Sequence, residues 1–189
     1  MAAWRPIARL RQVHTRPWLR PRPAAWLAFT GGCLLLLVVL LLDEDGFIPV
    51  LDHANLAFHE AGHFFFRPFG RTLHVLGGSL GQLVFPLVVV VLFWSRRDPI
   101  GVATGWIWFS ENLRYIATYM ADARARMLPI PKGTHHDWTT LFTWWGVLEH
   151  DTAIAAVVHF VSWAGMITSC LWAAWRHIRS RRQAEANTP

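Results

Sequence analysis

The residues best suited to chemistry form one short pattern, His59-Glu60-Ala61-Gly62-His63. On a helix, residues four positions apart share a face, so both imidazoles can reach a single metal ion. Glu60 lies beside the first histidine, where it can act as general base toward a metal-bound water. The pattern predicts a site for one zinc ion, with His59 and His63 as ligands and Glu60 as the catalytic base.

Two polar residues extend this pattern toward the N-terminus. Asp52 and Asn55 precede His59 at spacings of three and four, so they share its side of the predicted helix. A carboxylate or amide beside a ligating histidine orients the imidazole, which makes both residues candidates for ligation or support. An amphipathic helix with solvated histidines is the alternative explanation of the same stripe.

A site with two histidines needs a third protein ligand, and the segment 99–121 leads to one candidate. Asn112, Tyr115, Tyr119 and Asp122 recur there at three- and four-residue spacings. Acidic residues in or beside membrane segments usually serve function, so we expect Asp122 to be the third ligand, with Asn112 nearby. A local pair with Arg126 is the alternative for Asp122.

The connection 132–138 offers a competing source of ligands. His135, His136 and Asp137 are adjacent there, and each can bind a metal or support a ligating imidazole. A polar loop at the membrane surface explains the same residues without a metal. Gln82, whose amide needs a partner in a membrane, is a further candidate to line the site.

The other histidines have simpler explanations. Glu149-His150-Asp151 resembles the first turn of a helix, where acids are favoured by the helix dipole. His159 stands alone on an apolar segment, as a hydrogen-bonded core histidine does. We assign no role to His14, His74 and His177.

The elements that carry these residues belong to a membrane protein. Of the 189 residues, 53% are hydrophobic and only 16% are charged, whereas a soluble domain carries about a quarter. A membrane span needs about 20 mostly apolar residues. We therefore predict an all-α, polytopic protein with four full spans, at 24–42, 73–94, 99–121 and 152–175.

The segment 46–70, which contains the histidine motif, is long enough to cross but carries many polar residues. If it crosses there are five spans, and if it is partly inserted there are four. The overall distribution of basic residues is the same for both arrangements. Arg96 and Arg97 directly abut a span, where the positive-inside rule is strongest, and they favour four spans with a cytoplasmic N-terminus.

The net charge of +6 arises mostly from two tails, 1–23 and 177–189, which flank a single membrane domain at 24–176. Arginines placed next to apolar segments set topology and contact anionic lipid headgroups, so we expect a lipid bilayer and no nucleic acid as partner. We expect flexible tails and a location in a bacterial inner membrane. Two cysteines are too few for a disulfide scaffold.

The motif in a membrane segment resembles the intramembrane zinc metallopeptidases of the site-2 protease type. In that family, a glycine-rich stretch with an amide and then an Asn…Asp-Gly motif follow, and here Gly77 to Gln82 and Asn112 to Asp122 come in the same order. The resemblance implies His59, His63 and Asp122 as zinc ligands and a membrane-associated peptide as substrate. Asp122 is followed by Ala123 where the family has glycine.

Three functions follow as hypotheses. The first is a zinc metallopeptidase that cleaves a membrane-associated peptide bond. The second is a zinc hydrolase of lipid amides or esters, in which His135, His136 and Asp137 would be more central. The third is a metal-binding subunit of a membrane assembly without catalysis, which a closed four-ligand site would favour.

Overall fold

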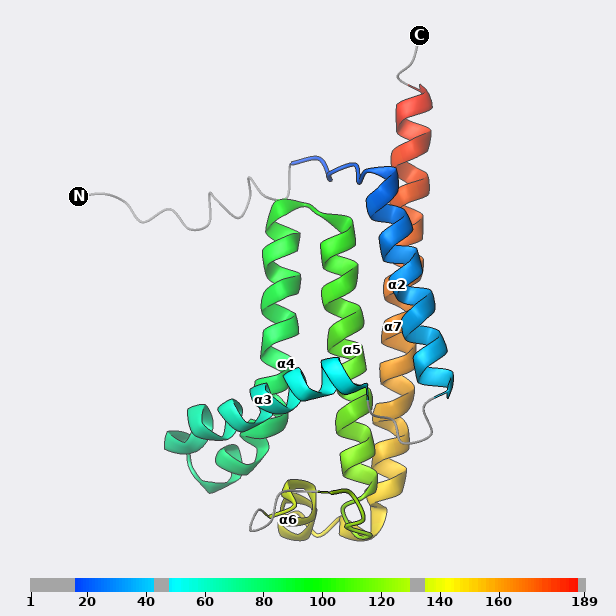
Figure 1. Cartoon of the computed structure of the whole chain (residues 1–189). Helices are drawn as coiled ribbons and strands as arrows, with labels where there is room; N and C mark the ends of the chain where they lie inside the picture. Colours follow the sequence, from blue (N-terminus) through cyan, green and yellow to red (C-terminus); the bar gives the residue numbers. More distant parts are fainter. Residues whose placement is uncertain (1–15, 43–47, 130–134, 187–189) are drawn as a thin grey trace, which may run out of the picture.

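The computed structural model describes residues 16–42, 48–129 and 135–186, and all regular secondary structure in this part of the chain is helical, with no strand. The all-α prediction is confirmed. Figure 1 shows α2, α4, α5 and α7 running up and down beside one another, while α3 and α6 lie toward the lower end. The start of α2, the turn between α4 and α5, and the C-terminal end of α7 all lie at the upper end.

Three helices are long and apolar enough to cross a membrane, which indicates a membrane protein. They are α2 (Pro23–Leu42), α4 (Arg71–Arg96) and α7 (Asp151–Ala186) with the 3-10 turn that precedes it. The fourth expected span, α5 (Pro99–Ala121), has the predicted bounds but is less apolar, and Glu111 is buried within it.

Helix α5 is the centre of the bundle because small residues let its neighbours approach. A Cβ on Gly101 would lie 2.2 Å from the Phe93 ring of α4, and one on Gly165 of α7 would lie 2.3 Å from Ser110 Oγ. The N-terminus of α5 is capped by Asp98, whose Oδ1 accepts from the backbone N–H groups of the second and third helical residues. Close packing on both sides therefore fixes α5 between α4 and α7.

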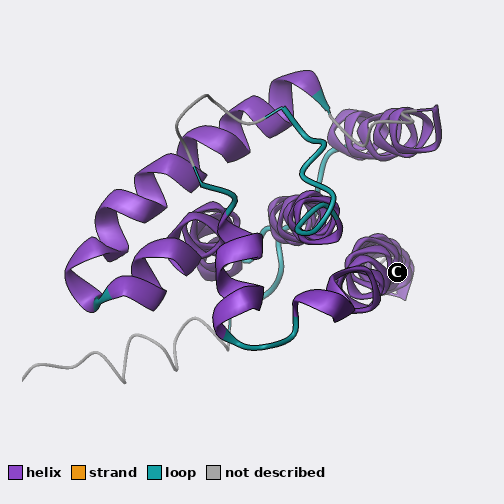
Figure 2. Ribbon diagram, turned by 90° about the horizontal axis from the view of Figure 1, so that it is seen from below, coloured by secondary structure: helices purple, strands orange, loops and turns teal. Residues whose placement is uncertain are grey.

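The motif helix, α3 (Pro49–Phe66), is inclined to the bundle rather than parallel to it. Seen from below in Figure 2, α3 is viewed lengthwise whereas α2, α5 and α7 are nearly end-on. The 3-10 turn Arg67–Phe69 and Gly70, at φ 99°, lead directly into α4. Only glycine adopts that φ without strain, so Gly70 sets the sharp reversal between the two helices.

Glycines also bring α3 and α4 into backbone contact. A Cβ on Gly62 would lie 2.1 Å from the Gly77 carbonyl oxygen, and one on Gly81 would lie 2.5 Å from the Phe58 carbonyl oxygen. No other residue fits such a close crossing. The glycine-rich stretch on α4, from Gly77 to Gln82, is therefore a packing surface for the motif helix.

The short helix α6 (Asp137–Trp144) closes the lower end. Leu141 and Phe142 of α6 are buried against Ile116 and Met120 of α5 and Ala155 of α7. The Thr139 hydroxyl donates to the Ala123 carbonyl. This apolar cluster holds the start of α6 beneath α5.

Asp151 begins α7, as the acidic first-turn pattern predicts. Its Oδ1 accepts from Thr152 N–H at 2.7 Å and from Arg124 Nε at 2.8 Å. Oδ2 accepts from Arg124 N–H at 3.1 Å. The carboxylate therefore caps α7 and ties it to the chain that leaves α5.

Two expectations for the tails change. Residues 177–186 continue α7 instead of forming a flexible tail, because they are mostly good helix formers with no proline or glycine among them. At the other tail, residues 1–15 lie outside the described part, whereas 16–22 lead into α2. Leu19 N–H there donates to the Arg97 carbonyl at 2.8 Å.

Helix α2 is the most peripheral element, because none of its residues is buried. It contacts α7 through the Trp26–His177 ring pair, with centroids 4.4 Å apart, and through the Cys33–Cys170 pair, with sulfurs 3.9 Å apart. Both cysteines are free thiols in packing positions, as the sequence indicates.

Candidate metal centre

Three side chains from distant parts of the chain converge at the lower end of the bundle. His59 Nε2 lies 2.8 Å from Asp137 Oδ2, and His63 Nε2 lies 3.1 Å from the same oxygen. One ligand atom from each of the three residues fits within 4.8 Å of the others. Among the described residues, this is the one group of three or more such side chains that could hold a metal ion.

The two histidines share one face of α3, as the spacing of the motif predicts, with ring centroids 4.7 Å apart. His59 is buried against α4, where Gly78 makes room for it. A Cβ on Gly78 would lie 2.4 Å from His59 Nε2. The glycine therefore determines where the ligand nitrogen of His59 lies.

His63 is oriented by a reciprocal pair of bonds with α4. Its Nδ1 lies 2.8 Å from the His74 carbonyl oxygen, and His74 Nδ1 lies 2.9 Å from the His63 carbonyl oxygen. A carbonyl only accepts, so each Nδ1 carries the proton. Nε2 of His63 is therefore the atom that can bind a metal. Groups that support a ligating histidine commonly fix its tautomer in this way.

Asp137 reaches the histidines from the first residue of α6, and its backbone N–H donates to the Tyr119 hydroxyl at 3.1 Å. Burial opposes ionisation of its carboxyl, but the hydrogen bonds from His59 and His63 outweigh burial and lower the pKa of Asp137. The carboxylate is therefore ionised at neutral pH and available as a ligand.

The same carboxylate acts on His63. The hydrogen bond to Asp137 raises the pKa of His63, against the effect of burial, and the bond to the His74 carbonyl and the charges of Asp137 and Glu60 add to the rise. Without a metal, the imidazole therefore holds its proton more tightly than a free histidine does. A metal ion that binds here displaces that proton.

His136 lies next to Asp137 but has a structural role. Its Nδ1 accepts from Thr139 N–H at 3.2 Å and so caps α6. Burial lowers the pKa of His136, and a neutral imidazole can accept this bond. Its ring lies 4.1 Å from the Tyr119 ring, centroid to centroid. His135, by contrast, is exposed.

Asp122, the expected third ligand, is used elsewhere. Its Oδ1 accepts from Met127 N–H at 2.7 Å and its Oδ2 from Leu128 N–H at 3.1 Å. Oδ2 is also 3.5 Å from His136 Nε2. Asp122 ends α5, and its carboxylate satisfies backbone groups of the turn that follows. The structure brings Asp137 to the histidines instead of Asp122.

Asp52 and Asn55 belong to a second buried cluster, away from the ligand atoms. Asn55 Nδ2 donates to Asp52 Oδ1 and to Glu111 Oε2 of α5, each at 3.1 Å, and Asn55 Oδ1 accepts from Trp108 Nε1 at 3.0 Å. The Arg114 guanidinium lies 3.5 Å from the carboxylate of Glu111, three residues earlier on α5. This cluster anchors the N-terminal half of α3 to α5.

The remaining candidates lie around the site without converging on it. Gln82 is buried, with no hydrogen bond to its Oε1, and Asn112 donates to the Trp108 carbonyl of its own helix at 3.1 Å. His159 is half-buried on α7. Glu60 is exposed beside the two histidines, so its carboxylate is open to solvent or substrate.

The donor set fits zinc. Two imidazole nitrogens and one carboxylate oxygen make up a typical three-ligand catalytic site. Tetrahedral ligands about 2.0–2.1 Å from zinc lie roughly 3.3–3.4 Å apart, and the two His–Asp separations are 2.8 and 3.1 Å. The two His–Asp contacts would therefore have to widen by a few tenths of an ångström to hold the ion, and all three ligand atoms already lie within 4.8 Å of one another.

Three contributors were not predicted from the sequence. His74, to which no role was given, orients His63 through its carbonyl, while Tyr119 supports the backbone of Asp137 and Gly78 makes room for His59. The helical face that includes Tyr119 was the available signal for that residue. Nothing in the sequence singles out the His74 carbonyl.

No family model, curated protein or solved structure matches the chain. The function must therefore be argued from the site itself.

Proposed function

We propose that this protein is a membrane-embedded, zinc-dependent hydrolase. The observation that carries the proposal is the convergence of His59, His63 and Asp137, one ligand atom each, within 4.8 Å. Two histidines and a carboxylate are the ligands of many hydrolytic zinc sites. Zinc held by such a set polarises a carbonyl and lowers the pKa of water.

The protein's own residues supply the other parts of hydrolysis. Glu60 follows His59 on α3 and is exposed, so it can take the proton of the attacking water and pass it to the leaving group. The His74 carbonyl keeps the Nδ1 proton on His63. Asp137 is held by α6 and by the Tyr119 hydroxyl. Two of the three ligands, His63 and Asp137, thus have a supporting hydrogen bond of the kind that a preorganised site uses.

An open coordination position supports catalysis over a structural metal. The described residues give the group three ligands and no fourth. Structural zinc sites are usually closed by four protein ligands, whereas catalytic sites keep one position for water or substrate. The hypothesis of a non-enzymatic metal-binding subunit is therefore less well supported.

For the substrate, the resemblance to site-2 proteases suggests a membrane-associated peptide bond. The geometry also favours a second candidate, a lipid amide or ester. The third ligand comes from Asp137 rather than Asp122, so the site departs from the family's ligand pattern. A ligand from the segment 135–137 is what the hypothesis of a lipid hydrolase expects, because that hypothesis makes this segment central.

The topology we propose has four crossings, with α5 as the fourth and α3 partly inserted at one face. α5 lies beside α4 and α7 and runs between the same two ends. Arginines cluster at the upper end, at 16–22, 96–97 and 176–182, where the positive-inside rule places the cytoplasm. The metal centre would then face the other side of the membrane.

The test is metal analysis together with hydrolysis. Purified wild-type protein is expected to hold one zinc, His59→Ala and Asp137→Asn to lose it, and Glu60→Gln to keep zinc but lose hydrolysis of a peptide or lipid panel. His159→Ala, which removes a half-buried histidine from α7, is the matched control and should change neither. Full zinc content in His59→Ala would refute the assignment of the site. Zinc binding without any hydrolysis would support the metal centre but contradict the proposal that the protein is an enzyme.

A further inference from the structure

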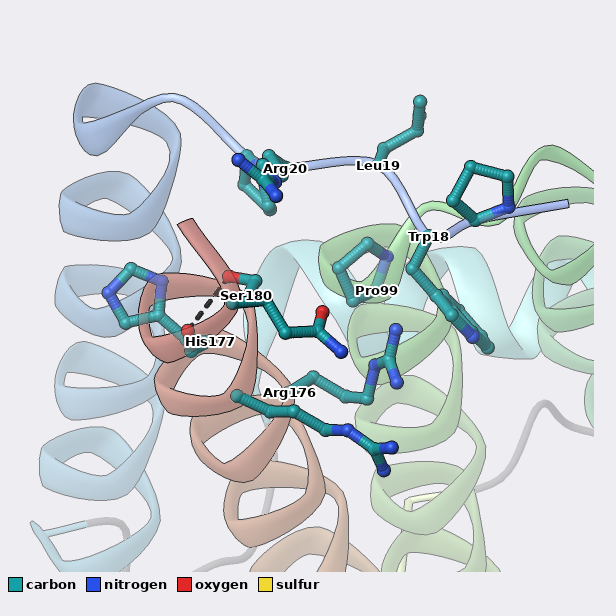
Figure 3. Close-up of a pocket in the computed structure, with 11 residues that line it drawn as sticks. Trp18, Leu19, Arg20, Pro99, Arg176, His177 and Ser180 are labelled. Carbon is teal, nitrogen blue, oxygen red and sulfur yellow. Dashed lines mark hydrogen bonds between the residues drawn. The ribbon is translucent and has the colours of Figure 1, made fainter. Parts of the chain in front are cut away.

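A second feature lies at the opposite end of the molecule from the metal centre. The segment before α2 and the C-terminal part of α7 enclose an open pocket of about 290 Å³. Figure 3 shows its lining residues, with Trp18 and Arg20 from the first segment and Arg176, His177 and Ser180 from α7. Its charged and polar lining side chains are Arg20, Arg176, His177, Arg179, Ser180 and Gln183.

The pocket concentrates positive charge that no acidic side chain of the described residues neutralises. No aspartate or glutamate lines it, and within the described residues Arg20, Arg176 and Arg179 form no ion pair. The nearby Asp98 is used to cap α5. Arg176 Nε is buried and has no hydrogen-bond partner in the part of the chain that the structure describes. Uncompensated guanidinium groups around a cavity indicate an anionic ligand.

The Trp18 ring is contacted by the guanidinium groups of Arg176 and Arg97. The guanidinium carbon of Arg176 lies 4.6 Å from the Trp18 ring centroid, and that of Arg97 lies 5.0 Å from it. The same ring meets Trp94 at 5.2 Å and Trp172 at 5.3 Å. Tryptophans with arginines above them are typical of the membrane–water interface, where headgroups lie.

An apolar groove begins at the same tryptophans. It has a volume of about 450 Å³ and runs between α5 and α7. Trp94 and Trp172, which contact Trp18, both line it, together with Val102, Phe109 and Val161. A basic pocket that meets an apolar groove at an interfacial tryptophan cluster matches the two parts of a phospholipid, a charged headgroup and an acyl chain.

We propose that this end of the protein binds an anionic phospholipid. The headgroup phosphate lies among Arg20, Arg176 and Arg179, which can donate paired N–H groups to its oxygens. An acyl chain lies in the groove between α5 and α7. A zwitterionic lipid is disfavoured because its cationic headgroup amine would enter a pocket that already carries several positive charges.

The experiment measures lipid binding to the full-length protein in detergent by native mass spectrometry. Phosphatidylglycerol and phosphatidylcholine with identical acyl chains are compared, with inorganic phosphate as a third ligand. Arg176→Gln/Arg179→Gln is expected to weaken phosphatidylglycerol binding about 30-fold. Arg181→Gln/Arg182→Gln, which removes the same charge from exposed positions outside the pocket, should leave it unchanged.

Two further variants separate the parts of the proposal. Arg176→Lys keeps the charge but not the paired donors, so it should fold and bind with intermediate affinity. Val161→Trp fills the groove and should weaken lipid binding without affecting inorganic phosphate. Equal binding of both lipids, or equal losses of lipid affinity in the two double variants, would contradict the proposal that this pocket binds an anionic headgroup. If inorganic phosphate binds as strongly as the lipid, the ligand of the pocket is a free phosphate and the assignment of a phospholipid is wrong.

Discussion

Gly78→Ala provides the sharpest test of the metal centre, because one added methyl group meets a ligand atom. The new Cβ would lie 2.4, 2.6 and 2.7 Å from Nε2, Cε1 and Cδ2 of the His59 ring. Ordinary contact begins at 3.4 Å, so the ring must move by about 1 Å. The neighbour is the end of a side chain, which can rotate away without moving the backbone.

The consequence is a loss of zinc rather than of fold. Metal–ligand distances tolerate only about 0.2 Å, so a displacement of about 1 Å removes His59 from coordination. Mutations of groups that merely orient a ligand cost 10–100-fold in affinity. We therefore expect Gly78→Ala to bind zinc at least about 100-fold more weakly, or about 2.7 kcal/mol.

The assay is zinc competition with a chromophoric chelator, combined with thermal unfolding in detergent. Two glycine variants serve as controls. Gly32→Ala in α2 has open space around the added Cβ and should resemble wild type. Gly62→Ala would meet the Gly77 backbone at 2.1 Å, so it should destabilise the fold itself. Wild-type zinc affinity in Gly78→Ala would refute the assigned position of the His59 ligand.

Two further predictions concern pH and topology. Asp137 raises the pKa of His63 above its ordinary 6.5, so zinc affinity should fall about tenfold per pH unit once the solution is more acidic than that raised pKa. In the metal-free protein, the His63–Asp137 pair should stabilise the fold fully below pH 6.5 as long as Asp137 stays ionised, and this contribution should fade as the pH rises through the raised pKa of His63. Thermal unfolding in chelator should show the loss as a falling unfolding temperature. With both native cysteines replaced by serine, an impermeant maleimide should label Arg71→Cys in intact cells but Arg181→Cys only after lysis, and the reverse pattern would contradict the proposed sidedness.

Helices were predictable from the sequence where hydropathy is nearly uniform. The predicted bounds of α5 match the observed ones, and the structure shows why the helix starts there: the Asp98 carboxylate caps it just before Pro99. The segment 46–70 left two arrangements open, since its polar stripe suits an interfacial helix or a crossing helix with an inward polar face. The position of this helix depends on Gly62, Gly77 and Gly81, which bring α3 and α4 into backbone contact. A contact between two helices cannot be predicted from the residue pattern of either helix alone.

The third ligand illustrates where sequence reasoning stops. Asp122 and Asp137 are equally plausible as residue types, and the family resemblance pointed to Asp122. The backbone turn after α5 decides against it, because the N–H groups of Met127 and Leu128 occupy the Asp122 carboxylate. Asp137 reaches the histidines because α6 folds back beneath α5. That return is driven by apolar packing rather than by any residue near the motif.

The buried polar residues divide into groups with different tasks, and this division explains why the motif helix can be short of a full span. Charge buried in a membrane protein is costly unless it is paired, so Glu111 and Arg114 must have polar partners. Glu111 pairs with Arg114 and accepts a hydrogen bond from Asn55, which also bonds Asp52, and these contacts fix one end of α3 to α5. Glycine contacts fix the other end to α4. Held at both ends, α3 needs no membrane-spanning length to keep its histidines in place, and Glu60 can remain exposed at the edge of the bundle.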